Sequence, residues 1–309
     1  MKVNPGYREW TFSEESYDAE YLEYRKKWSE FPNNDIRSVV PLHIDFEITT
    51  RCNLRCPFCP LQKMKIPRQD MELHLLSKVL TECAPKGTVA CKLNWRGEPT
   101  CNPELPKFIE LAKRLGIREV MINTNGLILN DQLLKTYTRY LDKLIVSVDS
   151  IQPEVYAKLR VGGSLETVLS NIKSVLKHRQ GRPWVRVQKI DLPETRNEDF
   201  IGFWRDFGVD QVAINSYKEK GDTGITPVNT EACAQLWQRL VIAVDGSVYP
   251  CCEGYRLGSL GNAKFESVEK MWNSEKINEW RNIHLAGHLE KLACKNCTVP
   301  IGGVYCGER

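Results

Sequence analysis

Three cysteines separated by three and then two residues constrain this chain more than any other feature. Cys52, Cys56 and Cys59 lie directly after an alternating apolar run that predicts a β-strand. Three thiolates this close in sequence can converge on one inorganic cluster. Iron-sulfur clusters usually take four cysteine ligands, so a set of three leaves one iron open to a ligand that is not protein. We therefore expect the chemistry of this chain at this loop.

Disulfides and a zinc site both fit the three cysteines less well than a cluster does. The first ten residues have no apolar core that would act as a secretory signal, and thiols stay reduced in the cytoplasm, so disulfides are not expected. A zinc site normally needs a fourth Cys or His nearby, and the next candidate, His74, falls on a helix-like segment. The 12 cysteines then indicate metal ligation in a reducing, cytoplasmic compartment.

The composition predicts a globular chain without a nucleic-acid or membrane partner. The chain has 309 residues, 42% of them hydrophobic and 27% charged, which suits one large domain with a small appendage. Its net charge of +4 is expected to be spread through the sequence, without the Lys/Arg block that would favour nucleic acid. No apolar stretch approaches the ~20 residues of a membrane-spanning helix.

From Pro41 onward the apolar pattern alternates between strand and helix periods. The six expected strands are Leu42–Ile48, Val89–Trp95, Glu119–Asn123, Leu144–Val148, Trp184–Ile190 and Gln211–Asn215. Helical segments separate them, which predicts a parallel sheet with right-handed crossovers and ligands at the carboxyl ends of the strands. Residues 1–40 are expected to form an extension with one short helix, Asp18–Glu30, packed across the outside of the main domain.

A second set of cysteines follows where the alternation of strands and helices stops. Tyr217–Asn229 is expected to be a linker or substrate-side loop, and Cys233 follows it. Val241–Pro250 predicts a tight hairpin around Asp-Gly and runs into Cys251 and Cys252. Two helices around 268–272 and 275–286 lead to Cys294-x-x-Cys297, and Cys306 lies near the end.

The first cysteine set, with Phe58 before its third member, resembles the signature of the radical S-adenosylmethionine (radical SAM) enzymes. The resemblance implies that Cys52, Cys56 and Cys59 hold a [4Fe-4S] cluster whose open iron is chelated by S-adenosylmethionine, with Phe58 near the adenine. It also implies a partial (βα)6 TIM barrel over residues 41–216, which fits the six predicted strands.

Loops at the predicted strand ends resemble the other cofactor-binding segments of that family. Arg96-Gly97-Glu98-Pro99 resembles its Gly-Gly-Glu segment, although Arg replaces the first Gly; a carboxylate suits the methionine ammonium group. The resemblance assigns further contacts with the cofactor to Asn123, Ser147, Asp149 and Arg160. A plain turn fits Asn123-Thr124-Asn125-Gly126 equally well.

The second cysteine set resembles the auxiliary iron-sulfur modules called SPASM or, when shorter, twitch. The resemblance implies a domain over residues 217–309 in which Cys233, Cys251, Cys294 and Cys297 hold one auxiliary [4Fe-4S] cluster. A structural zinc ribbon is the alternative, because cysteine pairs a hairpin apart are also typical of zinc. Cys83, Cys91 and Cys101 lack ligand spacing and are expected to be small buried residues.

The family resemblance implies an enzyme that cleaves SAM with an electron from a flavodoxin or ferredoxin type donor. The resulting 5'-deoxyadenosyl radical removes a hydrogen atom from the substrate. Cys252 follows a predicted ligand where sulfatase-maturing relatives have an Asp base, and a thiol can donate a hydrogen atom instead. The first hypothesis is therefore radical epimerisation with Cys252 as the hydrogen donor, although Cys252 as a cluster ligand or a buried residue stays open.

Three other functions remain open on the sequence. One is two-electron alcohol oxidation, with the auxiliary cluster accepting an electron and Glu253, Arg186 or Asp191 taking a proton. The others are modification of a peptide and a non-catalytic metal-binding scaffold. The N-terminal segment is expected to be too short for a peptide-binding module, and the loops 191–196 and 217–222 are polar. A carbohydrate, aminocyclitol or similar small polar molecule is therefore the expected substrate.

Overall fold

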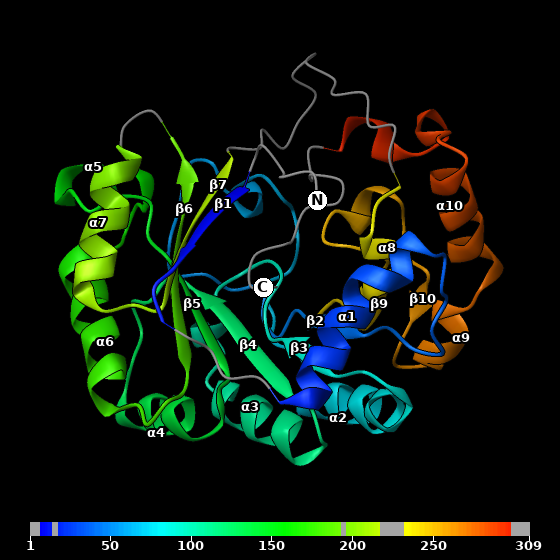
Figure 1. The fold of residues 1–309 in the computed structure, drawn as a ribbon, viewed down its shortest axis with the longest axis horizontal. Helices are drawn as coiled ribbons and strands as arrows, with labels where there is room; N and C mark the ends of the chain where they lie inside the picture. Colours follow the sequence, from blue (N-terminus) through cyan, green and yellow to red (C-terminus); the bar gives the residue numbers. More distant parts are fainter. Residues whose placement is uncertain (1–6, 14–17, 193–195, 217–231, 298–309) are drawn as a thin grey trace.

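The computed structural model describes residues 7–13, 18–192, 196–216 and 232–297 (Figure 1). Six consecutive parallel strands form the centre of a 10-stranded sheet. They are β2 (His43–Phe46), β3 (Ala90–Lys92), β4 (Glu119–Thr124), β5 (Lys143–Ser147), β6 (Trp184–Asp191) and β7 (Gln211–Ser216). The predicted partial (βα)6 barrel is confirmed. The predicted linker Tyr217–Asn229 and Cys306 lie outside the described residues.

Helices cover the outer face of this curved sheet (Figure 1). They are α2 (Leu73–Cys83), α3 (Leu105–Arg114), α4 (Asp131–Tyr140), α5 (Pro153–Leu159), α6 (Leu165–His178) and α7 (Asn197–Phe207). Alternate strand residues such as Ile44, Phe46 and Val120 join the apolar core beneath these helices. The residues between them face inward, because side chains alternate along a strand.

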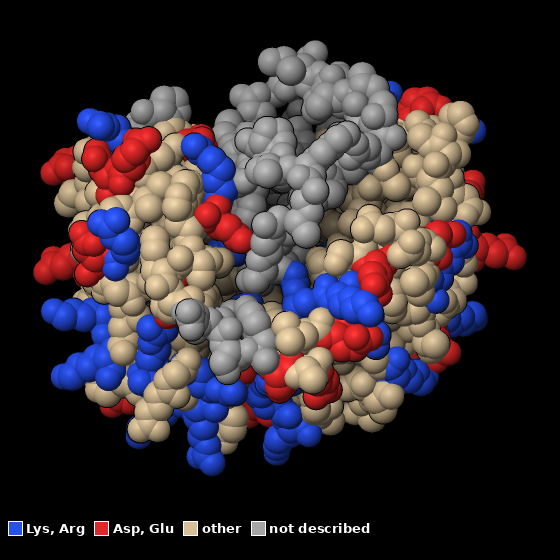
Figure 2. All heavy atoms as spheres, in the orientation of Figure 1, with Lys and Arg blue, Asp and Glu red and all other residues tan. Residues whose placement is uncertain are grey.

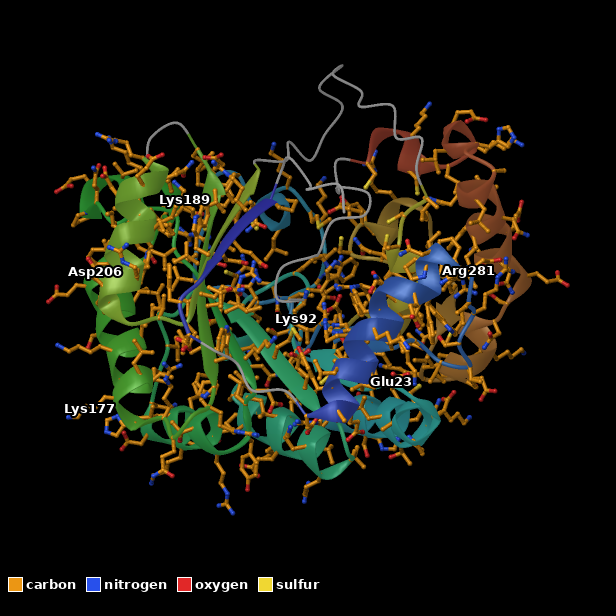
Figure 3. The ribbon with its side chains drawn as sticks, in the orientation of Figure 1. Glu23, Lys92, Lys177, Lys189, Asp206 and Arg281 are labelled. Atoms are coloured by element: carbon orange, nitrogen blue, oxygen red, sulfur yellow. The ribbon has the colours of Figure 1, made fainter. Side chains whose placement is uncertain are left out.

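The inner face of the sheet is unusually polar. Lys92 on β3, which is labelled in Figure 3, donates a hydrogen bond to Asp45 on β2 at 3.2 Å, and Arg239 donates another at 3.2 Å. His43 also lies 3.0 Å from Asp45. Burial alone would raise the pKa of Asp45. The positive charges of Lys92 and Arg239 lower it by more, so the pKa lies below its ordinary value. Paired charges of this kind are required where carboxylates are buried.

Both edges of the six-stranded core are extended by further strands; the sequence predicted the hairpin within 241–250 but neither β1 nor the pairing of the hairpin with β2. β1 (Tyr7–Thr11) pairs antiparallel with β7. β8 (Arg239–Ile242) pairs parallel with β2 and continues into β9 (Ser247–Tyr249) and β10 (Gly261–Asn262). The predicted hairpin at Asp245-Gly246 is therefore confirmed, and its first strand also belongs to the barrel sheet.

The N-terminal helix lies elsewhere than predicted. α1 (Ala19–Asn33) forms where the sequence indicated and begins at the Asp18 cap, but it does not pack across the outside of the domain. Its aromatic residues Tyr21, Tyr24 and Trp28 pack on Leu42 and Ala90, at the amino ends of β2 and β3. The Tyr21 hydroxyl donates to Glu119 at 2.8 Å. Aromatic side chains at helical spacing thus cover the inner face of the barrel at its amino end.

Three further helices complete the C-terminal part: α8 (Gln235–Gln238), α9 (Val268–Trp272) and α10 (Glu275–Leu285). α9 and α10 match the two helical segments predicted there. Among the described residues, no helix combines the length and the apolar character needed to cross a membrane.

The buried pair Glu119 and Lys143 yields a stability prediction. Their side chains are 3.0 Å apart and 3% and 4% exposed. Replacing Glu119→Gln leaves the Lys143 charge without its carboxylate and should lower the free energy of unfolding by about 3 kcal/mol. Urea denaturation of the cofactor-free protein measures this effect.

Glu104→Gln is the matched control, because Glu104, just before α3, and Lys107 in its first turn form an exposed pair at 2.7 Å. An exposed pair contributes roughly 0–1 kcal/mol. Equal losses of stability in the two variants would contradict the argument from burial.

Candidate functional site

The three cysteines of the first set lie together in the loop that follows β2. The Leu54 amide donates to the Cys52 sulfur at 3.4 Å, and the Cys59 amide donates to the Cys56 carbonyl at 3.0 Å. Burial raises the pKa of Cys56 to about 11, and the nearby Cys59 and Cys52 thiols add to this increase. The thiols are therefore near enough to interact electrostatically.

The donor set fits an iron-sulfur cluster. Within the described part of the chain, no three His, Cys, Asp or Glu side chains are grouped tightly enough to hold a single metal ion. Three cysteine thiols in one loop are the ligand type that an iron-sulfur cluster takes. Three cysteine ligands leave one iron open.

Loops from three neighbouring strands hold the cysteine loop in place. After β3, the Glu98 amide donates to the Arg51 carbonyl at 2.7 Å. After β4, the Asn125 side chain donates to the Asn53 side chain at 2.7 Å. After β5, the Val161 carbonyl accepts from the Arg55 amide at 2.9 Å. The cysteine loop is thus fixed by the same loops that were predicted to bind the cofactor.

Glu98 is a cross-link between two of these loops. Its buried carboxylate accepts hydrogen bonds from the Thr100 amide and hydroxyl, the Thr124 hydroxyl and the Asn125 amide, at 2.6–3.1 Å. Burial raises the pKa of Glu98, and these donors partly offset that effect. Sequence reasoning predicted an ammonium partner for Glu98 and missed this set of donors. The Asn-Thr-Asn-Gly segment was the available signal.

The other predicted cofactor residues form a chain of contacts across the strand ends. The Ser147 hydroxyl donates to the Asn123 side chain at 2.8 Å. Asp149 accepts from Arg160 at 2.5 Å and from the Ile190 amide at 3.0 Å. The Arg160 guanidinium lies 5.5 Å from the Phe58 ring centre, which connects this chain of contacts to the cysteine loop.

The second cysteine set is also brought together. Burial raises the pKa of Cys233 to about 12, and the Cys297, Cys294 and Cys252 thiols contribute to the increase. The pKa of Cys251 is raised in the same way, with Cys252 as its strongest thiol neighbour. The Cys233 amide donates to the buried His284 at 3.1 Å. Cys252 and the other three predicted ligands are therefore all among the thiols that raise the pKa of Cys251.

Trp95 connects the two cysteine sets and was not foreseen. Its indole N–H donates to the Cys252 carbonyl at 2.8 Å, and its ring packs on Tyr249 with centres 5.3 Å apart. Arg96 stacks on Trp95 at 4.1 Å and holds Glu47 with two hydrogen bonds of 2.5 and 2.7 Å. Because Gly97 follows directly, the loop that reaches the first cysteine set also contacts the second.

The proton acceptors proposed from sequence are dispersed. Asp191 pairs with Arg8 on β1 at 3.0 Å and accepts from Asn197 at 2.9 Å. Arg186 is fully buried on the inner face of β6. Glu253 accepts from the Tyr255 hydroxyl at 3.1 Å, next to Cys252. Of the three candidates, Glu253 is the one that directly follows the second cysteine set's hairpin.

The cysteines without ligand spacing fall into two groups. Cys83 and Cys91 are fully buried in the apolar core, as predicted. Cys101 differs, because it is half-buried beside the first set: the Asn53 amide bonds its sulfur, and burial, followed by Glu98 and Cys52, raises its pKa to about 11.

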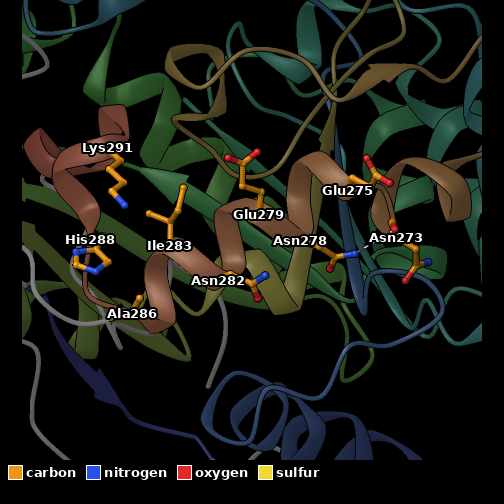
Figure 4. Close-up of a pocket in the computed structure, with 9 residues that line it drawn as sticks. All are labelled: Asn273, Glu275, Asn278, Glu279, Asn282, Ile283, Ala286, His288 and Lys291. Atoms are coloured by element: carbon orange, nitrogen blue, oxygen red, sulfur yellow. Dashed lines mark hydrogen bonds between the residues drawn. The ribbon is translucent and has the colours of Figure 1, made fainter.

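A shallow groove of about 520 Å³ runs along α10 and the turn after it (Figure 4). Polar side chains such as Glu279, Asn282 and Lys291 line it. No residue predicted to bind a cofactor or a metal contributes to this groove, so it is separate from the candidate site.

Gly97 provides the sharpest test of this site. Its φ is +74°, and a Cβ there would lie 2.4 Å from the Thr49 carbonyl oxygen and 2.8 Å from that of Arg51. Gly97→Ala should therefore displace the cysteine loop and abolish the first cluster. Iron per chain after anaerobic reconstitution should fall from about eight to about four.

The matched control is Gly116→Ala, because Gly116 has φ +90° and open space where its Cβ would be. It imposes a similar backbone strain without a clash. Retention of both clusters in Gly97→Ala would show that the close approach is not needed.

Several curated relatives resemble this chain. It is 25% identical over 306 residues to the antilisterial bacteriocin subtilosin biosynthesis protein AlbA of Bacillus subtilis, covering 87% of this chain and 67% of that protein. It is 31% identical over 221 residues to the GTP 3',8-cyclase of Limosilactobacillus fermentum, covering 68% and 61%. The probable GTP 3',8-cyclase of Methanococcus maripaludis is 30% identical, but the match spans less than half of its length (44%).

Solved structures share the fold. BtrN in complex with AdoMet and 2-DOIA has a TM-score of 0.60 at 20% identity, covering 84% of this chain and 93% of that one. SuiB of Streptococcus suis, bound to the precursor peptide SuiA, has a TM-score of 0.64 at 14% identity, covering 87% and 73%.

Family models match both parts of the chain. The model for the radical SAM superfamily matches residues 46–215, and that for the iron-sulfur cluster-binding domain SPASM matches residues 233–298. These matches imply a [4Fe-4S] cluster, S-adenosylmethionine and an auxiliary cluster, in agreement with the two cysteine sets. The chain belongs to the radical SAM superfamily and carries a SPASM domain after its barrel.

Proposed function

We propose that this radical SAM enzyme epimerises one carbon of a small polar substrate such as a carbohydrate or an aminocyclitol. Reductive cleavage of the bound SAM supplies the radical that removes a hydrogen atom from the substrate. Cys252 then returns a hydrogen atom to the opposite face of the same carbon. The observation that supports this role most is the hydrogen bond from Trp95 to the Cys252 carbonyl.

That hydrogen bond ties Cys252 to the loop that reaches the first cysteine set. Trp95 is two residues before Gly97, whose backbone contacts Thr49 and Arg51. The Cys252 amide also lies 3.4 Å from the Gln235 side-chain oxygen. The backbone of Cys252 is therefore hydrogen-bonded through both its carbonyl and its amide, at the junction of the two cysteine sets. A hydrogen donor needs such a fixed position, because misplacement of a reacting group by about 1 Å is costly.

In this proposal, the residues around the first cysteine set bind the SAM cofactor. Burial would lower the pKa of Arg160, but Asp149 raises it above its ordinary range, so Arg160 stays charged and can bind a carboxylate. Asn123 and Ser147 offer an amide and a hydroxyl to polar groups of the cofactor. Glu98 fixes the Gly97 loop through its four hydrogen bonds, and Phe58 provides an aromatic surface for the adenine.

The proposed reaction is balanced. The substrate C–H bond breaks, and its hydrogen leaves in 5'-deoxyadenosine. The S–H bond of Cys252 breaks next, and a new C–H bond forms with inverted configuration. The Cys252 thiyl radical would be reduced by one electron from the flavodoxin or ferredoxin type donor, relayed by the cluster that the adjacent auxiliary cysteines would hold, and one proton from water would restore the S–H bond.

Two-electron oxidation of an alcohol is the second candidate. It is favoured by Glu253, which follows Cys252 and is oriented by the Tyr255 hydroxyl at 3.1 Å, as a proton acceptor would need to be. A peptide substrate is a third possibility, because AlbA acts in bacteriocin biosynthesis and SuiB binds a precursor peptide. Neither likeness identifies the substrate of this chain.

The first test concerns the radical chemistry itself. Anaerobic reconstitution should give about eight iron and eight sulfide per chain, and reduction with dithionite should yield 5'-deoxyadenosine from SAM. Liquid chromatography with mass detection measures the nucleoside. A protein loaded with both clusters that forms no 5'-deoxyadenosine would leave only a metal-binding scaffold.

The second test separates epimerisation from oxidation in heavy water. Wild-type enzyme incubated with a panel of carbohydrates, aminocyclitols and peptides should give a product with one deuterium from solvent at a single carbon. Cys252→Ala should abolish that incorporation while it retains both clusters and still forms 5'-deoxyadenosine. Mass spectrometry measures the label.

Cys83→Ala is the matched control, because it removes a buried thiol from the apolar core. It should keep full incorporation. A product two hydrogens lighter than its substrate would establish the oxidation instead, and undiminished turnover of Cys252→Ala would remove its role as donor.

A further inference from the structure

The segment that carries the first cysteine set is basic. The chain holds 43 Lys and Arg against 39 Asp and Glu, a net charge of +4. Residues 51–70 hold five cationic side chains and a single acidic one. Residues 167–190 are basic as well, with six Lys and Arg and no Asp or Glu, so the positive charge is spread over more than one segment, as predicted.

These cationic side chains are exposed, and most have no ion-pair partner. The five are Arg51, Arg55, Lys63, Lys65 and Arg68. Asp70 pairs with Arg51 at 3.1 Å. No ion pair with another described residue involves the other four. The segment therefore presents uncompensated positive charge to solvent, which attracts acidic partners over a distance of about 10 Å.

Backbone contacts keep this charge next to the cysteines. The Thr50 amide donates to the Gln69 carbonyl at 3.0 Å, and the Thr50 hydroxyl donates to the Pro67 carbonyl at 2.7 Å. The Gln62 side chain lies 3.3 Å from the Leu54 carbonyl. Residues 60–70 thus fold back along residues 49–54, so that the exposed cations and the three thiols belong to one closed loop.

We propose that residues 51–68, the basic loop, form the docking surface for an acidic, low-potential electron-carrier protein of the flavodoxin or ferredoxin type. The inference rests on the proposed function, because each SAM cleavage consumes one electron. The carrier loses one electron, and the cluster held by Cys52, Cys56 and Cys59 gains it. A surface of opposite charge raises association rates by roughly 10- to 1,000-fold, and here it brings the carrier to the side of the molecule where the electron is needed.

The shape of the basic loop favours a protein over other anions. A small anion needs donors that converge in a concave site, whereas these side chains stand on an exposed loop. Single-stranded nucleic acid needs exposed aromatic rings for stacking. Phe58, the aromatic residue of this segment, is half-buried with Arg160 against its ring. A broad acidic protein surface fits the arrangement best.

The test compares two double charge reversals. Lys63→Glu/Lys65→Glu alters the basic loop, and Lys173→Glu/Lys177→Glu makes the same change of charge on α6. Figure 3 shows Lys177 on the outer side of the barrel, and Figure 2 shows several Lys and Arg side chains on the same side of the molecule. It lies in the last turn of α6, and a crossover helix ends near the amino edge of the sheet, opposite the cysteine loop.

Two measurements use the reconstituted protein and a reduced flavodoxin of net negative charge. Titration calorimetry gives the dissociation constant, and stopped-flow absorbance gives the rate of cluster reduction. At roughly 50 mM salt the basic-loop variant should bind and accept electrons about tenfold less well than wild type, and the α6 variant should stay within about twofold. At roughly 500 mM salt the difference should disappear because the charges are screened.

Dithionite, which needs no docking surface, separates this proposal from the proposed function. The basic-loop variant should form 5'-deoxyadenosine from dithionite at the wild-type rate. Loss of that activity would show that the loop acts on the cofactor, and flavodoxin binding equal to wild type would show that docking occurs elsewhere; either overturns the proposal.

A larger loss of binding to a DNA oligonucleotide than to flavodoxin would assign the surface to nucleic acid instead. Absence of 5'-deoxyadenosine in wild type with both reductants would refute the proposed function, while calorimetry still tests the docking.

Discussion

The close approach of Gly97 to the Thr49 and Arg51 carbonyls is the contact on which the site depends. A strand end of β3 can meet the start of the cysteine loop at this distance because Gly97 has no side chain and a φ of +74°. The Glu98 amide then bonds the Arg51 carbonyl, and the Glu98 carboxylate bonds the loop after β4. One glycine thus allows three loops to be joined around the three thiols.

Much of the fold could be predicted because its signals are local. Alternation in β2 and helical spacing in α3 or α6 depend on residues a few positions apart. The pairing of β1 with β7 could not, since it joins residues about 200 positions apart and needs no special side chains. The position of α1 also required the structure, because Tyr21, Tyr24 and Trp28 fit an outer or an inner packing face equally well.

The candidate site shows the same division. The cysteines and the loops after β3, β4 and β5 could be found, because the order of parallel strands places their carboxyl ends together. The partners of Glu98 and the role of Trp95 could not be predicted from spacing. Trp95 lies in the sequence among strand residues, and its hydrogen bond to Cys252 joins groups 157 residues apart. Contacts of this range depend on how the two cysteine sets are packed together.

That packing follows from the register of adjacent strands. β2 leads into the first cysteine loop, and β8, its parallel neighbour, leads through the Asp245-Gly246 turn to Cys251. Glu47, which follows β2, bonds both Arg96 and the Val244 amide, so the two strand ends are joined beyond the last ladder pair. A slip of one residue between β2 and β8 would turn Glu47 toward the helices and break both bonds. Because Arg96 also stacks on Trp95, the sheet register itself sets the position of Cys252 relative to the first three thiols.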